Sequence, residues 1–281
     1  KKIFTEADDK LGFKISKIIL EGPDNELKLT KNTQPAILIV SYSIYKILKN
    51  EFNMDFNDYK YFAGHSLGEY SALVCAGSLD FNDALYLLHE RGKAMQEAVP
   101  VGKGAMLAVL GVSLEEINFF ITKIETTQVC EIANDNAYGQ IIISGELNAI
   151  KKLQELLKTE RKKTILLPVS APFHCSLMKP AAEKMSNKIN SVAFNNAYIE
   201  IITNVAAEPE KKAVNIKNLL IQQIYSKVRW RESILYMVNQ GVNEFCEFGP
   251  GKVLTGLVKR ITKSSKVTNI NSNEDIKNFI K

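Results

Sequence analysis

One serine lies in a tight, glycine-flanked motif, Gly64-His65-Ser66-Leu67-Gly68. An apolar strand candidate, Tyr61-Phe62-Ala63, precedes the motif, and a helical pattern follows it as far as Gly77, which is suited to end a helix. A GxSxG motif between a strand and a helix is typical of a strained turn that exposes the serine hydroxyl. Ser66 is therefore the candidate nucleophile, and the Leu67 backbone N–H is a candidate oxyanion donor at the helix start. The simpler alternative is that Ser66 only caps the helix.

A serine hydroxyl needs a base at neutral pH, and the sequence has three histidines, His65, His89 and His174. His65 belongs to the turn itself, where its side chain is not expected to fold back onto its neighbour. His89 lies within a predicted helix. His174 follows a short loop between two predicted units, which is a common place for an active-site group. We therefore expect His174 to be the base.

Arg91 interrupts an apolar helix face. One stripe with alternating spacings of four and three contains Ala84, Leu88, Arg91, Met95 and Ala98. The guanidinium therefore projects from apolar surface and needs a partner. It either forms a structural ion pair with a nearby carboxylate of the protein, or it acts as a bidentate clamp for a carboxylate carried by a substrate.

The segments that must position these residues alternate between strands and helices. Before residue 104 we expect a turn at 31–33, a helix over 35–48 and a second helix that begins at Asn82 or Asp83 and ends near Val99. The next unit predicts strands at 105–110, 129–133, 140–144 and 164–169, with helices at 114–124 and 147–157. Its order, βαββαβ, is that of a ferredoxin-like module. Beyond it we expect a strand at 198–203, helices at 216–225 and 233–240, a last strand at 244–248 and a polar loop over 264–273.

These elements predict an α/β fold with an inserted unit. Helices interleaved with strands favour a mostly parallel, covered sheet. We expect an α/β-hydrolase-like large catalytic domain with a parallel central sheet, formed by residues 1–101 and 171–281. The ferredoxin-like subdomain, residues 102–170, is inserted into it.

Composition excludes several classes of protein. The chain of 281 residues is 46% hydrophobic, and its longest apolar runs are far shorter than the ~20 residues that span a bilayer, so we expect no membrane association. The four cysteines are too widely spaced for a redox pair or a zinc site, which predicts no metal and a reducing compartment. We expect a cytoplasmic protein or, alternatively, a mature protein within an organelle. The net charge of +5 is modest and scattered, which disfavours nucleic acid and suits an acidic partner protein or a phosphorylated ligand.

Four segments together resemble the malonyl-CoA:acyl-carrier-protein transacylases. The resemblance covers residues 4–260 in the family's order. It rests on Gly64-His65-Ser66-Leu67-Gly68-Glu69-Tyr70-Ser71-Ala72-Leu73, Arg91-Gly92-Lys93-Ala94-Met95-Gln96, Pro168-Val169-Ser170 leading to His174, and Gly249-Pro250-Gly251-Lys252-Val253-Leu254-Thr255-Gly256-Leu257.

The resemblance implies a role for each matching residue. Ser66 would be acylated by malonate, His174 would be the general base, and Arg91 would bind the free malonyl carboxylate. The imidazole would be oriented by the backbone carbonyl of Gln223, so no aspartate is needed. Three further matches border the family's cleft, namely Gln34, Asn136 and Asn204.

Two departures from the family pattern stand out. The family normally opens with a strand that ends in a Gly-Gln-Gly turn, whose glutamine amide completes the oxyanion hole. The sequence contains no such segment and begins Lys1-Lys2-Ile3, so we expect a preceding segment to exist. The second departure is Phe173, where single-enzyme relatives often carry serine. A ring there resembles the malonyl-selective domains of polyketide synthases and would crowd a 2-methyl substituent.

The implied activity is transfer of malonyl from malonyl-CoA to the phosphopantetheine thiol of acyl carrier protein through a malonyl-serine, in fatty acid biosynthesis. Both thioesters would be substrates, no cofactor would be needed, and a monomer is expected. A serine thioesterase or hydrolase would use the same pair of residues but leaves Arg91 unexplained. A catalytically dead interaction protein would not need Ser66, His174 and Arg91 together.

Overall fold

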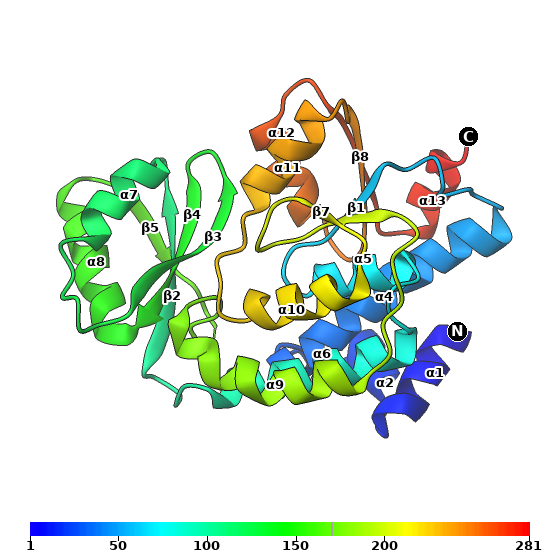
Figure 1. The fold of residues 1–281 in the computed structure, drawn as a ribbon, viewed down its shortest axis with the longest axis horizontal. Coiled ribbons are helices and arrows are strands. Elements are labelled where there is room, and N and C mark those ends of the chain that lie inside the picture. Colours follow the sequence, from blue (N-terminus) through cyan, green and yellow to red (C-terminus); the bar gives the residue numbers. More distant parts are fainter. Residues whose placement is uncertain (170) are drawn as a thin grey trace.

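The computed structural model describes residues 1–169 and 171–281. The fold is mixed α/β, with a larger helix-rich body and a smaller unit at one end (Figure 1). Ser170, the last residue of the predicted insert, lies outside the described residues. Within the described residues, no helix is both long enough and apolar enough to cross a bilayer.

The N-terminal part of the large body is helical. It contains α1 (Lys2–Leu11), α2 (Ile15–Glu21), α3 (Asp24–Leu27) and the long α4 (Thr30–Glu51). The turn predicted at 31–33 is wrong, because α4 begins at Thr30 and runs through Pro35. A proline has no N–H to give to the carbonyl four residues earlier. His89 Nδ1 lies 2.9 Å from the Lys31 oxygen and supplies that bond instead, so His89 has a structural role.

The serine motif lies where β1 (Tyr61–Ala63) passes into α5 (Gly68–Cys75), as predicted. The next helix, α6 (Phe81–Glu97), begins earlier than expected, because the Asp80 side chain accepts from the Asn82 N–H and is the N-cap. Helix α6 packs between α4 and α9 (Lys179–Ser191). A Cβ on Gly92 would lie 2.5 Å from Lys31 Cα, so only glycine allows α6 to approach α4 this closely.

The strands of the large body form two small ladders. Strand β1 pairs in parallel with β6 (Glu200–Ile202), and β7 (Pro209–Glu210) adds to β6 in antiparallel orientation. Separately, β8 (Glu244–Phe248) pairs in parallel with β9 (Lys266–Ile270). The predicted parallel pairing is therefore present, but the described strands do not join into one central sheet. A cavity of about 470 Å³, lined by β1 and β8, separates the two ladders.

Strand β9 corrects two predictions. It lies inside the segment expected to be a polar loop, and it makes β8 the last strand but one. Its alternation is weak in the sequence because Thr268 and Asn269 are polar, while pairing with β8 buries Ile270 completely. The remaining helices of this body are α10 (Ala213–Gln223), α11 (Trp230–Asn239), α12 (Val253–Ile261) and α13 (Asn273–Phe279).

The small unit has the predicted order of elements. It consists of β2 (Gly104–Leu110), α7 (Leu114–Ile121), β3 (Cys130–Ala137), β4 (Gln140–Glu146), α8 (Leu147–Thr159) and β5 (Lys163–Leu166). The strands form an antiparallel sheet in the order β3-β4-β2-β5, and the two helices bury an apolar core of their own against it. Strand β3 is longer than predicted and includes Asn134, Asp135 and Asn136, because three successive polar residues hide a strand from any apolar pattern.

The small unit is fastened to the large body through β3. The Asp135 N–H donates to the Val228 carbonyl at 3.0 Å, and the Val228 N–H donates to the Ala133 carbonyl at 2.8 Å. The buried Asp135 carboxylate also pairs with Arg231 of α11 at 2.8 Å. The two units are therefore connected by backbone hydrogen bonds as well as by an ion pair.

Candidate active site

Ser66 lies in a left-handed turn between β1 and α5, with φ of 52°. A left-handed conformation is costly for serine and persists only where its surroundings hold it. A Cβ on Gly64 would lie 2.0 Å from Gly68 C and O, so the turn closes only around glycine. The Ser66 N–H donates to Asn204 Oδ1 at 2.6 Å, and the Ser66 carbonyl accepts from Gln223 Nε2 at 3.0 Å. Both backbone groups of the serine are therefore bound by side chains.

Ser66 and His174 form a dyad. Ser66 Oγ lies 2.8 Å from His174 Nε2, and His174 Nδ1 lies 2.8 Å from the Gln223 carbonyl oxygen. The carbonyl can only accept, so Nδ1 carries the proton and Nε2 is free to take the serine proton. His174 is 5% exposed, and its burial, followed by the charge of Arg91, lowers the pKa of the imidazole to about 3. His174 is therefore neutral at physiological pH, with Nε2 able to accept a proton.

The loop that carries His174 is held by the small unit. His174 also has a positive φ of 58°, and Ser176 follows it at the start of a short 3-10 helix, Ser176–Met178. The Glu131 carboxylate of β3 accepts from the Ser176 N–H at 2.9 Å and from its hydroxyl at 2.5 Å. A carboxylate from the insert thus caps the helix that follows the base.

Arg91 points at the dyad from α6 and is only 1% exposed. Its Nη1 donates to Gln34 Oε1 at 2.6 Å, and its Nη2 donates to Gln223 Oε1 at 2.8 Å and to Ser66 Oγ at 3.1 Å. Among the described residues, no carboxylate lies within ion-pair distance of the guanidinium, and Arg91 Nε has no partner. The structural ion pair considered from the sequence is therefore not formed.

The remaining predicted site residues lie around this cluster. Asn204 is buried and, besides accepting from the Ser66 N–H, donates from its Nδ2 to the Gly64 carbonyl at 2.8 Å. Asn136 Oδ1 lies 2.8 Å from His65 Nε2, which joins β3 to the serine motif. Phe173 is half-buried and packs against the apolar cores of both units. The Leu67 N–H, at the N-terminus of α5, has no hydrogen-bond partner among the described residues.

The other two histidines make contacts elsewhere. His65 packs against the Trp230 ring at 5.6 Å and makes the contact to Asn136, and burial lowers its pKa. His89 holds α4, as described above. Neither contacts Ser66 Oγ in the described structure, where the hydroxyl has only His174 and Arg91 as partners.

Sequence reasoning missed Glu69 and Glu131. Glu69 is 1% exposed and accepts from Gln223 Nε2 at 2.7 Å and from the Asn204 N–H at 3.1 Å. It is the one charged residue of the short helix α5. A single charge among uncharged helix residues can be recognised in the sequence. Glu131 gives no such signal, because its partner Ser176 lies 45 residues away.

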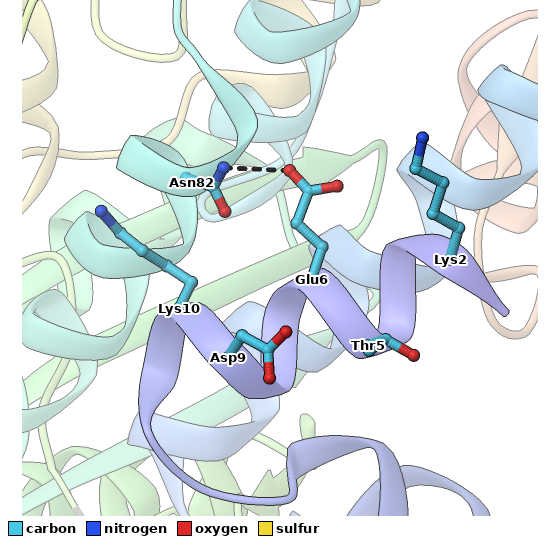
Figure 2. Close-up of a pocket in the computed structure, with 6 residues that line it drawn as sticks. All are labelled: Lys2, Thr5, Glu6, Asp9, Lys10 and Asn82. Carbon is cyan, nitrogen blue, oxygen red and sulfur yellow. Dashed lines mark hydrogen bonds between the residues drawn. The ribbon is translucent and has the colours of Figure 1, made fainter.

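Of two depressions in the described structure, one borders the site. The cavity between β1 and β8 reaches the serine motif at Gly64, His65, Leu67 and Gly68, while Ser66 itself is not among its lining residues. Three polar atoms of residues that line it lack partners among the described residues: Ser71 Oγ, Thr255 Oγ1 and Trp230 Nε1. A shallower depression lies over the polar face of α1, where Asn82 Nδ2 donates to Glu6 Oε1 at 2.9 Å (Figure 2). Its lining residues do not belong to the Ser66 cluster.

Comparison with known proteins places this geometry in a family. The family model described as the acyl transferase domain matches residues 5–279. The malonyl CoA-acyl carrier protein transacylase of Bacillus subtilis is 44% identical over 279 residues, which cover 98% of this chain and 86% of that protein. The acyl-carrier-protein S-malonyltransferase of Bartonella henselae is 42% identical, with a TM-score of 0.96 over 99% of this chain and 89% of that one.

A further solved structure contains a partner. It holds a malonyl-transacylase in complex with a type II polyketide synthase acyl carrier protein, and it matches this chain at 38% identity and a TM-score of 0.95, covering 99% of this chain and 90% of that one. With the serine turn, the His174 base and the buried Arg91 in one cluster, and with relatives of this similarity along almost its entire length, the chain belongs to the acyl transferase family of malonyl-CoA:acyl-carrier-protein transacylases.

Proposed function

We propose that the chain transfers malonyl from malonyl-CoA to the phosphopantetheine thiol of acyl carrier protein, through a malonyl ester on Ser66. The observation that carries this proposal is the 3.1 Å distance between Arg91 Nη2 and Ser66 Oγ. In malonyl-CoA, one methylene separates the free carboxylate from the thioester carbonyl. A carboxylate bound to Arg91 therefore leaves the thioester carbon next to the serine hydroxyl.

In the first half-reaction, Ser66 Oγ attacks the thioester carbon while His174 Nε2 takes its proton. The 2.8 Å contact between these two atoms is within the range required of a general base. The tetrahedral intermediate collapses, the C–S bond breaks, and His174 returns the proton to the departing coenzyme A sulfur. The product is malonyl-Ser66 and free coenzyme A.

The Leu67 N–H is suited to the developing oxyanion. It lies at the N-terminus of α5 without a partner among the described residues, so both the N–H and the helix dipole favour negative charge there. The second half-reaction reverses the first. The thiol of acyl carrier protein gives its proton to His174 and attacks the ester, and Ser66 leaves with the proton returned.

The choice of acyl group would depend on Arg91, Gln34 and Phe173. Gln34 holds Nη1 of Arg91 at 2.6 Å and so leaves Nη2 directed at the serine. A buried guanidinium without a carboxylate partner among the described residues is prepared for an anionic acyl group rather than for acetyl. Phe173, beside the base, would crowd a 2-methyl substituent, and Asn136 would border the same cleft.

A serine hydrolase is the weaker alternative. It would use the same dyad, but it gives no role to a guanidinium that contacts the nucleophile. The relatives are named as transacylases, which favours thiol over water as the acceptor.

Several finer assignments belong to the same proposal. The strand order of the small unit supports the ferredoxin-like subdomain at 102–170, and the strand–serine–helix turn supports an α/β-hydrolase-like large domain at 1–101 and 171–281. The dyad and Arg91 need no cofactor or metal for acyl transfer. Four free cysteines fit a cytoplasmic location, and a monomeric enzyme remains our expectation.

Intact-mass spectrometry after mixing with malonyl-CoA tests the proposal. We expect one malonyl adduct, mapped to Ser66, that disappears on addition of the carrier protein thiol and is absent in Ser66→Ala. In Arg91→Ala, the malonylation rate should fall about 10²-fold, since charge-assisted hydrogen bonds are lost, while acetylation changes much less. Release of the acyl group to water instead of thiol would favour the hydrolase, and an unmodified wild type would refute both.

A further inference from the structure

The cluster contains one buried carboxylate to which acyl transfer assigns no task. Glu69 is the second residue of α5 and is 1% exposed. A single oxygen, Oε2, accepts both from the Asn204 N–H at 3.1 Å and from Gln223 Nε2 at 2.7 Å. A buried charge is retained only where donors surround it, so these two contacts are what keeps the carboxylate in place.

The first donor leads to the serine backbone. With its own N–H bound by Glu69, Asn204 accepts the Ser66 N–H at its side-chain oxygen and donates from its amide to the Gly64 carbonyl. The side chain of Asn204 therefore connects the first residue of the glycine-flanked turn to the serine at its centre. Glu69 fixes the residue that holds the left-handed serine.

The second donor leads to the other two functional groups. One amide nitrogen, Gln223 Nε2, binds both Glu69 and the Ser66 carbonyl. This orientation turns Gln223 Oε1 toward Arg91 at 2.8 Å. The reversed amide would point an NH₂ at a guanidinium, which is electrostatically unfavourable. The backbone carbonyl of Gln223 meanwhile orients His174.

We propose that Glu69 is a positioning residue that fixes Ser66 through Asn204 and fixes both Ser66 and Arg91 through the amide of Gln223. The inference deepens the proposed transfer function and rests on it. The competing explanation is that Glu69 merely stabilises the N-terminus of α5, where a carboxylate favours the helix dipole. The two explanations differ in what the loss of Glu69 changes.

The test compares Glu69→Gln with Glu183→Gln, a matched change at an exposed residue of α9. Single-turnover acylation is measured with malonyl-CoA and with acetyl-CoA, alongside thermal unfolding. For Glu69→Gln we expect malonylation to slow about 10²-fold, as misplacement of reacting groups by about 1 Å does. Acetylation should slow less, because only malonyl also needs the orientation of Arg91. A role confined to helix stability would lower both rates by one common factor, which would overturn the proposal.

Two further variants, Gln223→Met and Glu69→Asp, check the same proposal independently. Gln223→Met removes the amide and keeps the backbone carbonyl, so it should reproduce the loss, and the double variant should be little worse than the worse single one. Full additivity would overturn the proposal. If Glu69→Gln does not fold, Glu69→Asp keeps the charge but withdraws the acceptor, and it should show the same malonyl-selective loss. Wild-type malonylation by Glu69→Asp would contradict the positioning role of Glu69.

Failure of this inference can be told apart from failure of the proposed function. A fluorophosphonate labels an activated serine without malonate or Arg91. Reduced labelling of Glu69→Gln relative to wild type supports positioning of Ser66 even if malonyl-CoA proves not to be the substrate. Equal labelling together with equal malonylation in the two proteins would leave the transfer function intact and refute the role of Glu69.

Discussion

The two halves of the dyad are positioned in different ways. Ser66 lies in a turn built by its own sequence neighbours, with glycine at position 64 and a helix that starts at once after it. His174 lies on a loop whose conformation depends on distant residues: the Gln223 carbonyl at one side and Glu131 of the inserted unit at the other. Both residues have a positive φ. Side chains of Asn204 and Gln223 also bind the Ser66 backbone, but the shape of its turn is already allowed by the glycines of the motif. A positive φ is thus produced at Ser66 mainly by a local motif and at His174 by long-range contacts.

The largest effects are expected from substitutions of Ser66 and His174, which test whether the two residues act as one unit. We expect His174→Ala to lower single-turnover acylation by about 10⁴-fold or more, as in other serine enzymes that lose the base. Ser66→Ala should abolish the adduct, and the variant lacking both should be no worse than Ser66→Ala alone. Substantial malonylation of His174→Ala at neutral pH would mean that another group, such as His65, can act as base.

This difference explains what the sequence could and could not predict. The strand, turn and helix around Ser66 follow from local pattern, and so does the order βαββαβ of the small unit, because both depend on neighbouring residues. The isolated charge of Arg91 on an apolar stripe pointed to a residue that the structure places against Ser66. The roles of Asn204, Glu69 and Glu131 were not visible, since each depends on partners far along the chain. Polar strands such as β9 and the end of β3 also escaped, because apolar alternation was absent.

A smaller effect probes the long-range side of the comparison. Glu131→Gln weakens the two bonds to Ser176, and we expect acylation to fall about tenfold and the free energy of unfolding to fall by about 1–2 kcal/mol. The loss should apply equally to malonyl and acetyl, because Glu131 acts on the base and not on Arg91. Glu155→Gln, an exposed change in α8, provides the control. A malonyl-selective loss in Glu131→Gln would contradict this assignment.

The smallest effect at neutral pH is a pH dependence that involves the Ser66 half of the dyad and not His174. Burial raises the pKa of Glu69 to about 7, although Gln223, Asn204 and the charge of Arg91 favour the ionised form. The other titratable group near it, Tyr70, stays neutral because burial raises its pKa to about 12. His174 stays neutral as well. As the pH falls through about 7, Glu69 takes up a proton and becomes a weaker acceptor, so acylation should slow.

Stopped-flow acylation from pH 5 to pH 8 checks this prediction. The wild type should lose rate below about pH 7 and approach Glu69→Gln, whose rate should be low and flat. If Glu69→Gln still lost rate below about pH 7, the pH dependence would belong to another group. For stability the sign is opposite: the pKa of Glu69 is raised from 4.5, so its contribution is full below about 4.5 and lost above about 7.

The position of Gln223 has a consequence for altering acyl preference. This one residue contacts the Ser66 carbonyl with its amide nitrogen, Arg91 with its amide oxygen, and the His174 imidazole with its main chain. Replacing it to reshape the cleft would disturb all three at once, so library design aimed at bulkier or uncharged acyl chains has little freedom there. Phe173 is half-buried, and the hydrogen bonds of the cluster do not involve its side chain. We therefore expect that substitutions at Phe173 can alter acyl selectivity without breaking the hydrogen bonds among Ser66, His174 and Arg91.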